Sequence, residues 1–115
     1  MNMSSTTFIQ EETCRRAGSP VCIPNENLKI GIALQTKKLQ PVTGMRGVPE
    51  NGTEGWYVWA GEYSKDPDFF QPIHIIHLIE IWPEIVPYLA LAPGYRFIID
   101  NEGYEDMWYE PIIGE

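Results

Sequence analysis

Hydrophobic residues gather in extended runs over the first half of the chain, and these runs predict β-strands. The segments 28–36 and 41–48 are apolar with few polar interruptions, which is typical of a first and a second strand. Residues 49–55 consist of turn formers around an Asn-Gly pair that readily adopts positive φ, so we expect a loop there. The aromatic run 56–60 that follows predicts a central strand.

Between residues 72 and 89 the apolar period changes to one close to that of an α-helix. Ile73, Ile76 and Ile79 recur at helical spacing, so an amphipathic helix is predicted. Pro83 lacks an amide hydrogen and clashes with the preceding turn. We therefore expect the helix to end before Pro83 and a short second helix to follow the kink.

The C-terminal part of the chain predicts a β-hairpin. Residues 95–100 and 104–109 have the strand pattern, and the loop between them ends in Gly103, which is suited to a left-handed conformation. Strands come first, helices in the middle and a hairpin last. The sequence therefore predicts an α+β fold: an antiparallel β-sheet with a kinked helix pair packed on one face and a C-terminal β-hairpin.

The first 22 residues differ in character from the rest. Residues 1–22 are polar and follow neither apolar period, so they predict a flexible N-terminal arm, and we expect a single domain over residues 23–115. The start shows no basic segment followed by an apolar run, as an export signal would have. A cytoplasmic location is then the default expectation, with Cys14 and Cys22 reduced.

The charge of the chain is strongly negative and unevenly distributed. The net charge is −8, but residues 1–48 carry +3 while residues 49–115 carry −11. Such acidity repels nucleic acid and anionic membranes, and the longest apolar stretch, residues 73–91, is broken by His, Glu and Pro and so is no membrane span. The asymmetry favours a basic partner, although acids that merely keep a hydrophobic domain in solution are an equally open interpretation.

Metal-ligand residue types gather in the predicted helical region, where His74, His77, Glu80 and Glu84 recur at spacings of three and four. They lack the His-Glu-x-x-His order of zinc peptidases, and a polar stripe opposite the isoleucines is the favoured explanation. No Gly-x-Ser-x-Gly motif and no glycine-rich phosphate loop occur in the chain. We therefore predict no catalytic residue, no cofactor and no metal site, and a protein that is not an enzyme.

Three ordered motifs carry a resemblance to a known family. They are Gly-Trp-Tyr-Val-Trp-Ala-Gly-Glu at 55–62, the segment 76–89 with Pro-Glu-Ile at 83–85, and Ala-Pro-Gly-Tyr-Arg-Phe at 92–97. Together they resemble the small bacterial immunity-protein domains of polymorphic toxin systems. The resemblance implies a protein that neutralises a toxin by binding it, and it brings no catalytic residues with it.

The resemblance and the charge asymmetry together predict a non-enzymatic protein that binds a cognate toxin with a basic surface through its own acidic surface. The candidate contact residues are acids expected in loops and turns near strand ends: Glu50, Glu54, Glu62, Asp66, Asp68, Asp100, Glu102 and Glu105. Two alternatives remain open. One is a metal-dependent hydrolase that uses His74, His77 and Glu80, and the other is a regulatory module that forms homodimers through an exposed sheet edge.

Overall fold

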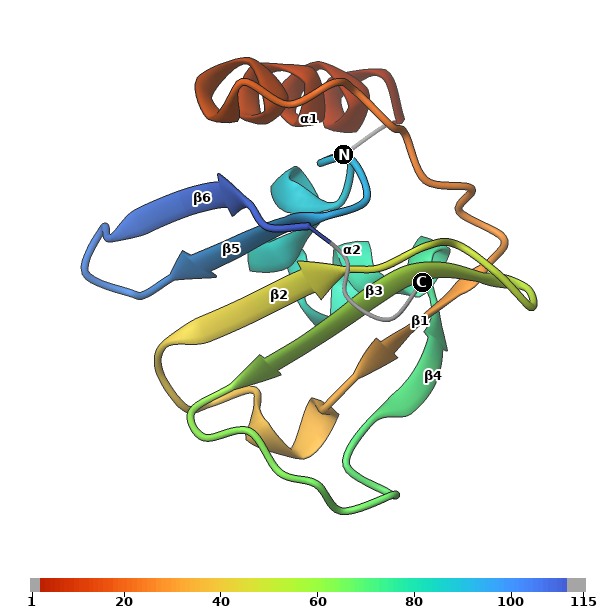
Figure 1. Ribbon diagram of the computed structural model, residues 1–115, viewed down its shortest axis with the longest axis vertical. Coiled ribbons are helices and arrows are strands. Elements are labelled where there is room, and N and C mark those ends of the chain that lie inside the picture. The colour runs from red at the N-terminus through yellow and green to blue at the C-terminus, as the bar shows by residue number, and fades with distance from the viewer. Residues whose placement is uncertain (1–2, 112–115) are drawn as a thin grey trace.

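The computed structural model describes residues 3–111, and its central feature is a six-stranded sheet with the short helices of residues 75–88 behind it (Figure 1). The strands follow the order β4-β1-β3-β2-β5-β6. The predicted α+β fold is confirmed. The six strands are β1 (Lys29–Ile32), β2 (Val42–Arg46), β3 (Thr53–Ala60), β4 (Gln71–His74), β5 (Tyr95–Ile99) and β6 (Glu105–Tyr109).

The predicted antiparallel arrangement is wrong for one pair: the sheet is mixed, because β1 runs parallel to β3 whereas all other neighbouring strands are antiparallel. The connection from β1 to β2, which contains the short helix η1 (Leu34–Thr36), passes the end of β3. The predicted central strand is correct, since β3 lies in the interior of the sheet between β1 and β2. The β2–β3 turn also forms as predicted, with φ of 54° at Asn51 and 78° at Gly52.

The C-terminal hairpin of β5 and β6 is confirmed as well. Its strands pair from Tyr95 opposite Tyr109 to Ile99 opposite Glu105. Gly103 has a φ of 94°, which is the left-handed conformation expected of it.

The hydrophobic core lies between the sheet and the helices. Along β3 the side chains of Trp56, Val58 and Ala60 are buried in it, while Tyr57 between them is exposed, as expected when successive strand residues point to opposite faces. In the view of Figure 1 the N-terminal helix (residues 3–17) lies above the sheet, and the short helices of residues 75–88 lie behind it. We call the sheet face that points away from them, and that carries Tyr57, the open face.

The predicted helix from residue 72 is wrong in its first part. Residues 71–74 form the edge strand β4, in which Ile73 pairs with Ile30 of β1. Pro72 is compatible with an edge strand, because its missing N–H can face away from the ladder. Backbone pairing with the free edge of β1 thus outweighs the helical spacing of the isoleucines.

Helical structure begins only after His74, with η2 (Ile75–His77) and α2 (Leu78–Ile81). The break at Pro83 is as predicted, and the helix η3 (Pro83–Tyr88) follows it. Among residues 3–111, no helix combines the length and the apolar character needed to cross a bilayer.

The largest departure from the sequence prediction is at the N-terminus, where the expected flexible arm is wrong for residues 3–17. They form helix α1 (Met3–Ala17), which packs against η3. Its buried side chains are polar or small, at Thr6, Gln10, Thr13 and Cys14, so no apolar period marks the helix in the sequence. The domain boundary at residue 23 stays a prediction.

Candidate partner-binding surface

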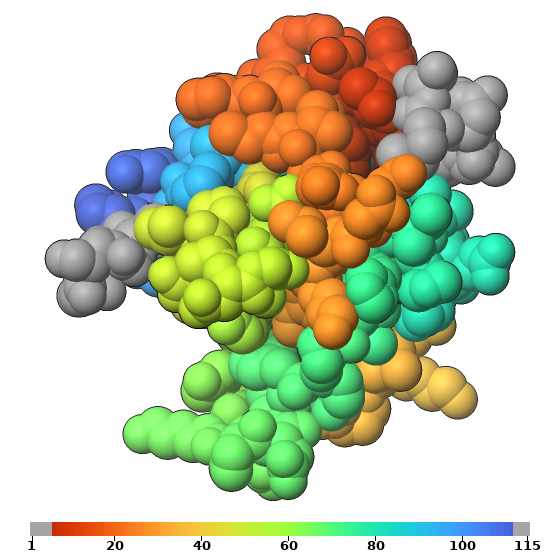
Figure 2. All heavy atoms as spheres, turned by 90° about the vertical axis from the view of Figure 1, so that its right-hand side faces the viewer, coloured from red at the N-terminus to blue at the C-terminus, as the bar shows by residue number. Residues whose placement is uncertain are grey.

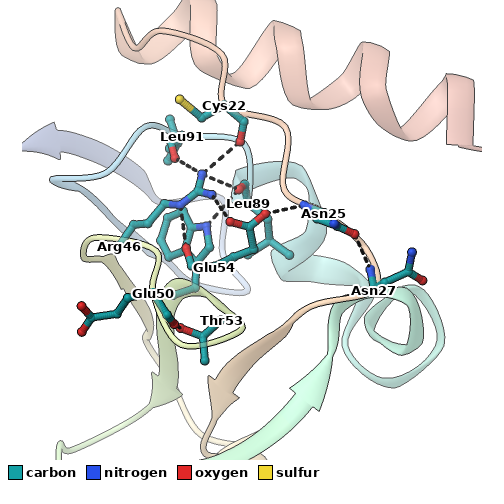
Figure 3. Close-up of polar contacts among 10 residues, drawn as sticks. Cys22, Asn25, Asn27, Arg46, Glu50, Thr53, Glu54, Leu89 and Leu91 are labelled. Carbon is teal, nitrogen blue, oxygen red and sulfur yellow. Dashed lines mark hydrogen bonds and ion pairs between the residues drawn. The ribbon is translucent and has the colours of Figure 1, made fainter.

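The most extensive polar cluster surrounds the side chain of Arg46 at the end of β2 (Figure 3). This side chain is only 2% exposed. Its Nε donates to the carbonyl of Glu54 at 3.0 Å, and Nη1 donates to three further carbonyls: Cys22 at 3.0 Å, Leu91 at 2.8 Å and Leu89 at 3.3 Å. We call this the Arg46 network. It ties two strands to two irregular segments that are far apart in the sequence.

Glu54 belongs to this network, and its predicted place in an exposed loop is wrong. The residue lies at the start of β3 and is buried. Its Oε1 pairs with Arg46 Nη2 at 3.4 Å, and its Oε2 accepts from the backbone N–H of Asn25. Burial lowers the pKa of Arg46, and the charge of Glu54 counteracts this effect. Glu54 therefore stabilises the fold and offers no surface to a partner.

Two other predicted contact residues, Asp66 and Asp100, close turns with their carboxylates. Asp66 Oδ1 accepts from the N–H of Asp68 at 2.8 Å. Asp100 Oδ1 accepts from the N–H groups of Glu102 at 2.8 Å and Tyr104 at 2.9 Å. These are Asx-type turns, in which the side chain replaces a backbone acceptor.

Glu105 joins three elements at the start of β6. Its Oε2 accepts from Arg16 Nη2 of α1 at 2.8 Å and from the Tyr88 hydroxyl of η3 at 2.5 Å, while Oε1 accepts from Arg16 Nε at 3.2 Å. Partial burial raises the pKa of Glu105, but the hydrogen bonds from Tyr88 and Arg16 and the charge of Arg16 outweigh it, so the pKa is below its ordinary value.

This arrangement predicts an acid-dependent loss of stability. A carboxylate with a lowered folded-state pKa contributes its full stability above the unfolded pKa of a glutamate, about 4.3, and loses it as the pH falls through the folded value. Glu105→Gln should lower the free energy of unfolding by up to about 1 kcal/mol at pH 7. The free energy of unfolding of this variant should also decrease less as the pH falls. Urea midpoints between neutral and acid pH measure this, with Glu102→Gln, an exposed residue, as control. Equal curves for the two variants would contradict the assignment.

The predicted acids other than Glu54 and Glu105 are exposed, except for the half-buried Asp100, and the structure separates them into two groups. Glu50 lies on the β2–β3 turn, with its carboxylate pointing away from the Arg46 network (Figure 3). The opposite end of the sheet holds the larger group, which we call the acidic end: Glu62, Asp66, Asp68, Asp100 and Glu102.

Segment 40–41 joins the two loops of the acidic end. Gly61 donates its N–H to the carbonyl of Pro41 at 2.9 Å, and Asn101 donates its N–H to Gln40 Oε1 at 3.0 Å. Within residues 3–111, the side chains of Glu62, Asp68 and Glu102 form no ion pair. Three lysines lie on the same segments or beside them and reduce the negative charge: Lys37, Lys38 and Lys65.

The predicted contact residues do not include the aromatic side chains on the open face, chiefly Tyr57, Trp59 and Phe70. Their rings contact one another across the end of β3. The signal was present in the run 56–60, because inward-pointing Trp56 requires Tyr57 and Trp59 to point to the other face.

The residues of the metal-hydrolase alternative lie on three different elements. His74 ends β4, His77 ends η2 and Glu80 is in α2, and the two imidazole rings are 6.1 Å apart between centroids. Among the described residues 3–111, no three His, Cys, Asp or Glu side chains are grouped so as to hold a metal ion. The geometry thus gives this alternative no support.

Comparison with known proteins identifies the family. The model of the Imm33-like domain matches residues 9–110, which confirms the resemblance to immunity-protein domains seen in the motifs. No curated protein and no solved structure matches the chain. Since the family match runs from the middle of α1 past the end of β6, the protein belongs to the Imm33-like domain family, a family of immunity proteins.

Proposed function

We propose that this protein neutralises a cognate protein toxin by binding it in the cytoplasm, without catalysis. The observation that carries the proposal is membership in the Imm33-like domain family over residues 9–110. The net charge of −8 supports a toxin with a basic surface, because opposite charges accelerate encounter and disfavour wrong partners.

The acidic end is the part of the surface that we assign to this encounter. Within the part of the chain that the structure describes, its exposed carboxylates at Glu62, Asp68 and Glu102 have no ion pair to give up when they meet a cationic side chain. They also lie on two loops held together by segment 40–41, so the acidic end is fixed in shape before binding.

The first test is co-expression with the product of the adjacent upstream gene, where the toxin of such a pair is expected. Cells that express that product should survive when this protein is present, and the two proteins should co-purify. Absence of both rescue and co-purification would contradict the proposed function.

The second test concerns the acidic end. The double variant Glu62→Lys with Glu102→Lys should lower the association rate with the toxin about tenfold at low ionic strength and change the dissociation rate much less. The matched control is Glu11→Lys with Glu50→Lys, which changes the net charge equally at exposed positions outside the acidic end. Stopped-flow or surface-based kinetics measure both. Equal slowing in the two variants would show that total charge, and not the acidic end, attracts the toxin.

A further inference from the structure

Five aromatic rings gather on the open face at the end of β3. Tyr57 and Trp59 belong to β3, and the loop that follows folds back so that its own rings join them. Neighbouring rings have centroids 4.9 to 6.2 Å apart, mostly edge to face. We call this the ring cluster: Tyr57, Trp59, Tyr63, Phe69 and Phe70.

The ring cluster lies on the other side of the sheet from the core, and much of it is exposed. Tyr57 is 47% and Tyr63 is 56% exposed, whereas Phe69 is buried beneath them. Tyr and Trp are enriched among the residues that contribute most of the binding energy of protein interfaces. The loop of residues 61–70, green in Figure 2, projects from the lower end of the molecule and is accessible to a partner.

The loop that carries three of the rings is held in place by hydrogen bonds. The Phe69 N–H donates to the carbonyl of Asp66 at 2.9 Å, and the Phe69 carbonyl accepts from Gln35 Nε2 at 3.0 Å. Gln71 Nε2 donates to the carbonyl of Asp68 at 3.0 Å. A surface ordered in this way loses little entropy on binding.

Gly31 of β1 makes room for the rings. A Cβ at this position would lie 2.8 Å from Cδ1 of Tyr57 and 3.4 Å from Cβ of Phe70. The strand thus lacks a side chain where the rings lie against it.

The open face continues from the ring cluster as a row of cross-strand neighbours. Tyr57 is opposite Met45, Met45 is opposite Arg96, and Arg96 is opposite Trp108. All three of these neighbours are partly exposed. Tyr, Trp, Met and Arg are the residue types enriched in protein interfaces.

The charge around the ring cluster defines the kind of partner. The loop 61–70 carries three acids, Glu62, Asp66 and Asp68, against Lys65. Carboxylates on the same loop attract a guanidinium or ammonium group, and such a group also binds over the face of an exposed tyrosine ring. A second copy of this chain is disfavoured, since a two-fold contact would bring the same acids together.

We propose that the ring cluster is the contact surface for an arginine- or lysine-rich segment of the partner protein. This rests on the proposed function, in which the partner is the toxin, and it identifies the surface that slows dissociation, whereas the acidic end speeds association. The rings stack against the apolar stems and cationic heads of the segment, and the loop acids beside them attract its charges during the encounter.

The test compares truncation of the exposed rings with truncation of a ring elsewhere. The probe is the product of the adjacent upstream gene, and calorimetry measures its affinity for each variant. Tyr57→Ala and Tyr63→Ala should each weaken binding at least tenfold. Phe8→Ala, which removes a 63% exposed ring from α1, should change it less than threefold. Urea midpoints of all variants verify that they are folded.

The outcomes separate this inference from the proposed function. If the unaltered protein binds and the tyrosine variants behave like Phe8→Ala, the ring cluster is not the contact surface, and the proposed function stands. If the unaltered protein does not bind, both are overturned. Salt separates a cationic partner segment from an uncharged one, because charges are screened over roughly 50 to 200 mM salt. If the tyrosine variants lose binding but the affinity of the unaltered protein stays the same over this range, the partner segment is not cationic.

Discussion

Arg46→Met should lower the free energy of unfolding by about 3 to 5 kcal/mol, a large part of the stability of a domain of this size. The substitution preserves most of the apolar stem but removes all the hydrogen bonds that the Arg46 guanidinium donates. The carbonyls of Cys22 and Leu91 then lose this donor, whereas the carbonyl of Leu89 keeps the bond from the Trp56 indole N–H at 2.9 Å. The carboxylate of Glu54 stays buried without a counter-ion. Urea denaturation followed by circular dichroism measures the change.

Two further variants decide whether the buried network is the cause. Arg96→Met removes a guanidinium from a partly exposed ion pair with Glu110 and should cost less than about 1 kcal/mol. Adding Glu54→Gln to Arg46→Met should recover part of the loss, because the unpaired charge is gone. An Arg46→Met variant as stable as Arg96→Met would show that the network contributes little.

Gly44→Ala is the second substitution for which we expect a large effect, a loss of about 2 to 3 kcal/mol. A Cβ at Gly44 would lie 2.1 Å from Cε2 of Phe97. That ring is fully buried and has no room to move, since it lies between Trp56, at 5.5 Å between centroids, and Tyr88, at 4.7 Å. Chemical denaturation reports the loss.

The matched control is Gly47→Ala on the segment that follows β2, where the nearest heavy atom to a new Cβ is 3.9 Å away. The free energy of unfolding of this variant should remain within about 0.5 kcal/mol of that of the unaltered protein. Phe97→Leu should lower the free energy of unfolding less in the Gly44→Ala variant than in the unaltered protein, because the smaller side chain relieves the clash. Additive costs would mean that the clash with Phe97 does not explain the loss.

The sequence predicts the fold where local signals and tertiary structure agree. The β2–β3 turn and the β5–β6 hairpin are determined by residues such as Gly52 and Gly103, whose conformation depends on the turn itself. The sequence prediction fails where pairing with a strand far away in the sequence determines the secondary structure. Residues 71–74 have helical spacing, yet they complete the edge of β1, about 40 residues earlier in the chain.

Helix α1 shows a second kind of failure. Apolar periodicity detects a helix only when the buried face is apolar, and here that face contains Thr6, Gln10 and Thr13. The Gln10 side chain donates to the carbonyl of Val86 at 2.9 Å, so hydrogen bonding takes the place of some hydrophobic contact. Such a bond joins residues that no local pattern connects.

The candidate site is predicted only in part for a similar reason. Residue type and turn context correctly place Glu62, Asp68 and Glu102 at the surface. Glu54 has the same context but is buried, because its partner Arg46 approaches from the neighbouring strand. The ring cluster depends on how loop 61–70 folds back on the sheet, which the sequence alone does not specify.

The strand order affects how the chain folds during its synthesis. β1 pairs only with β3 and β4, and both are made after it. About 20 residues separate the end of β1 from the start of β3, which at 5 to 20 residues per second is roughly one to four seconds of translation. Ile30 and Ile32 leave the ribosome without a partner strand, so the nascent protein exposes a hydrophobic strand until the β2–β3 hairpin has emerged to receive it.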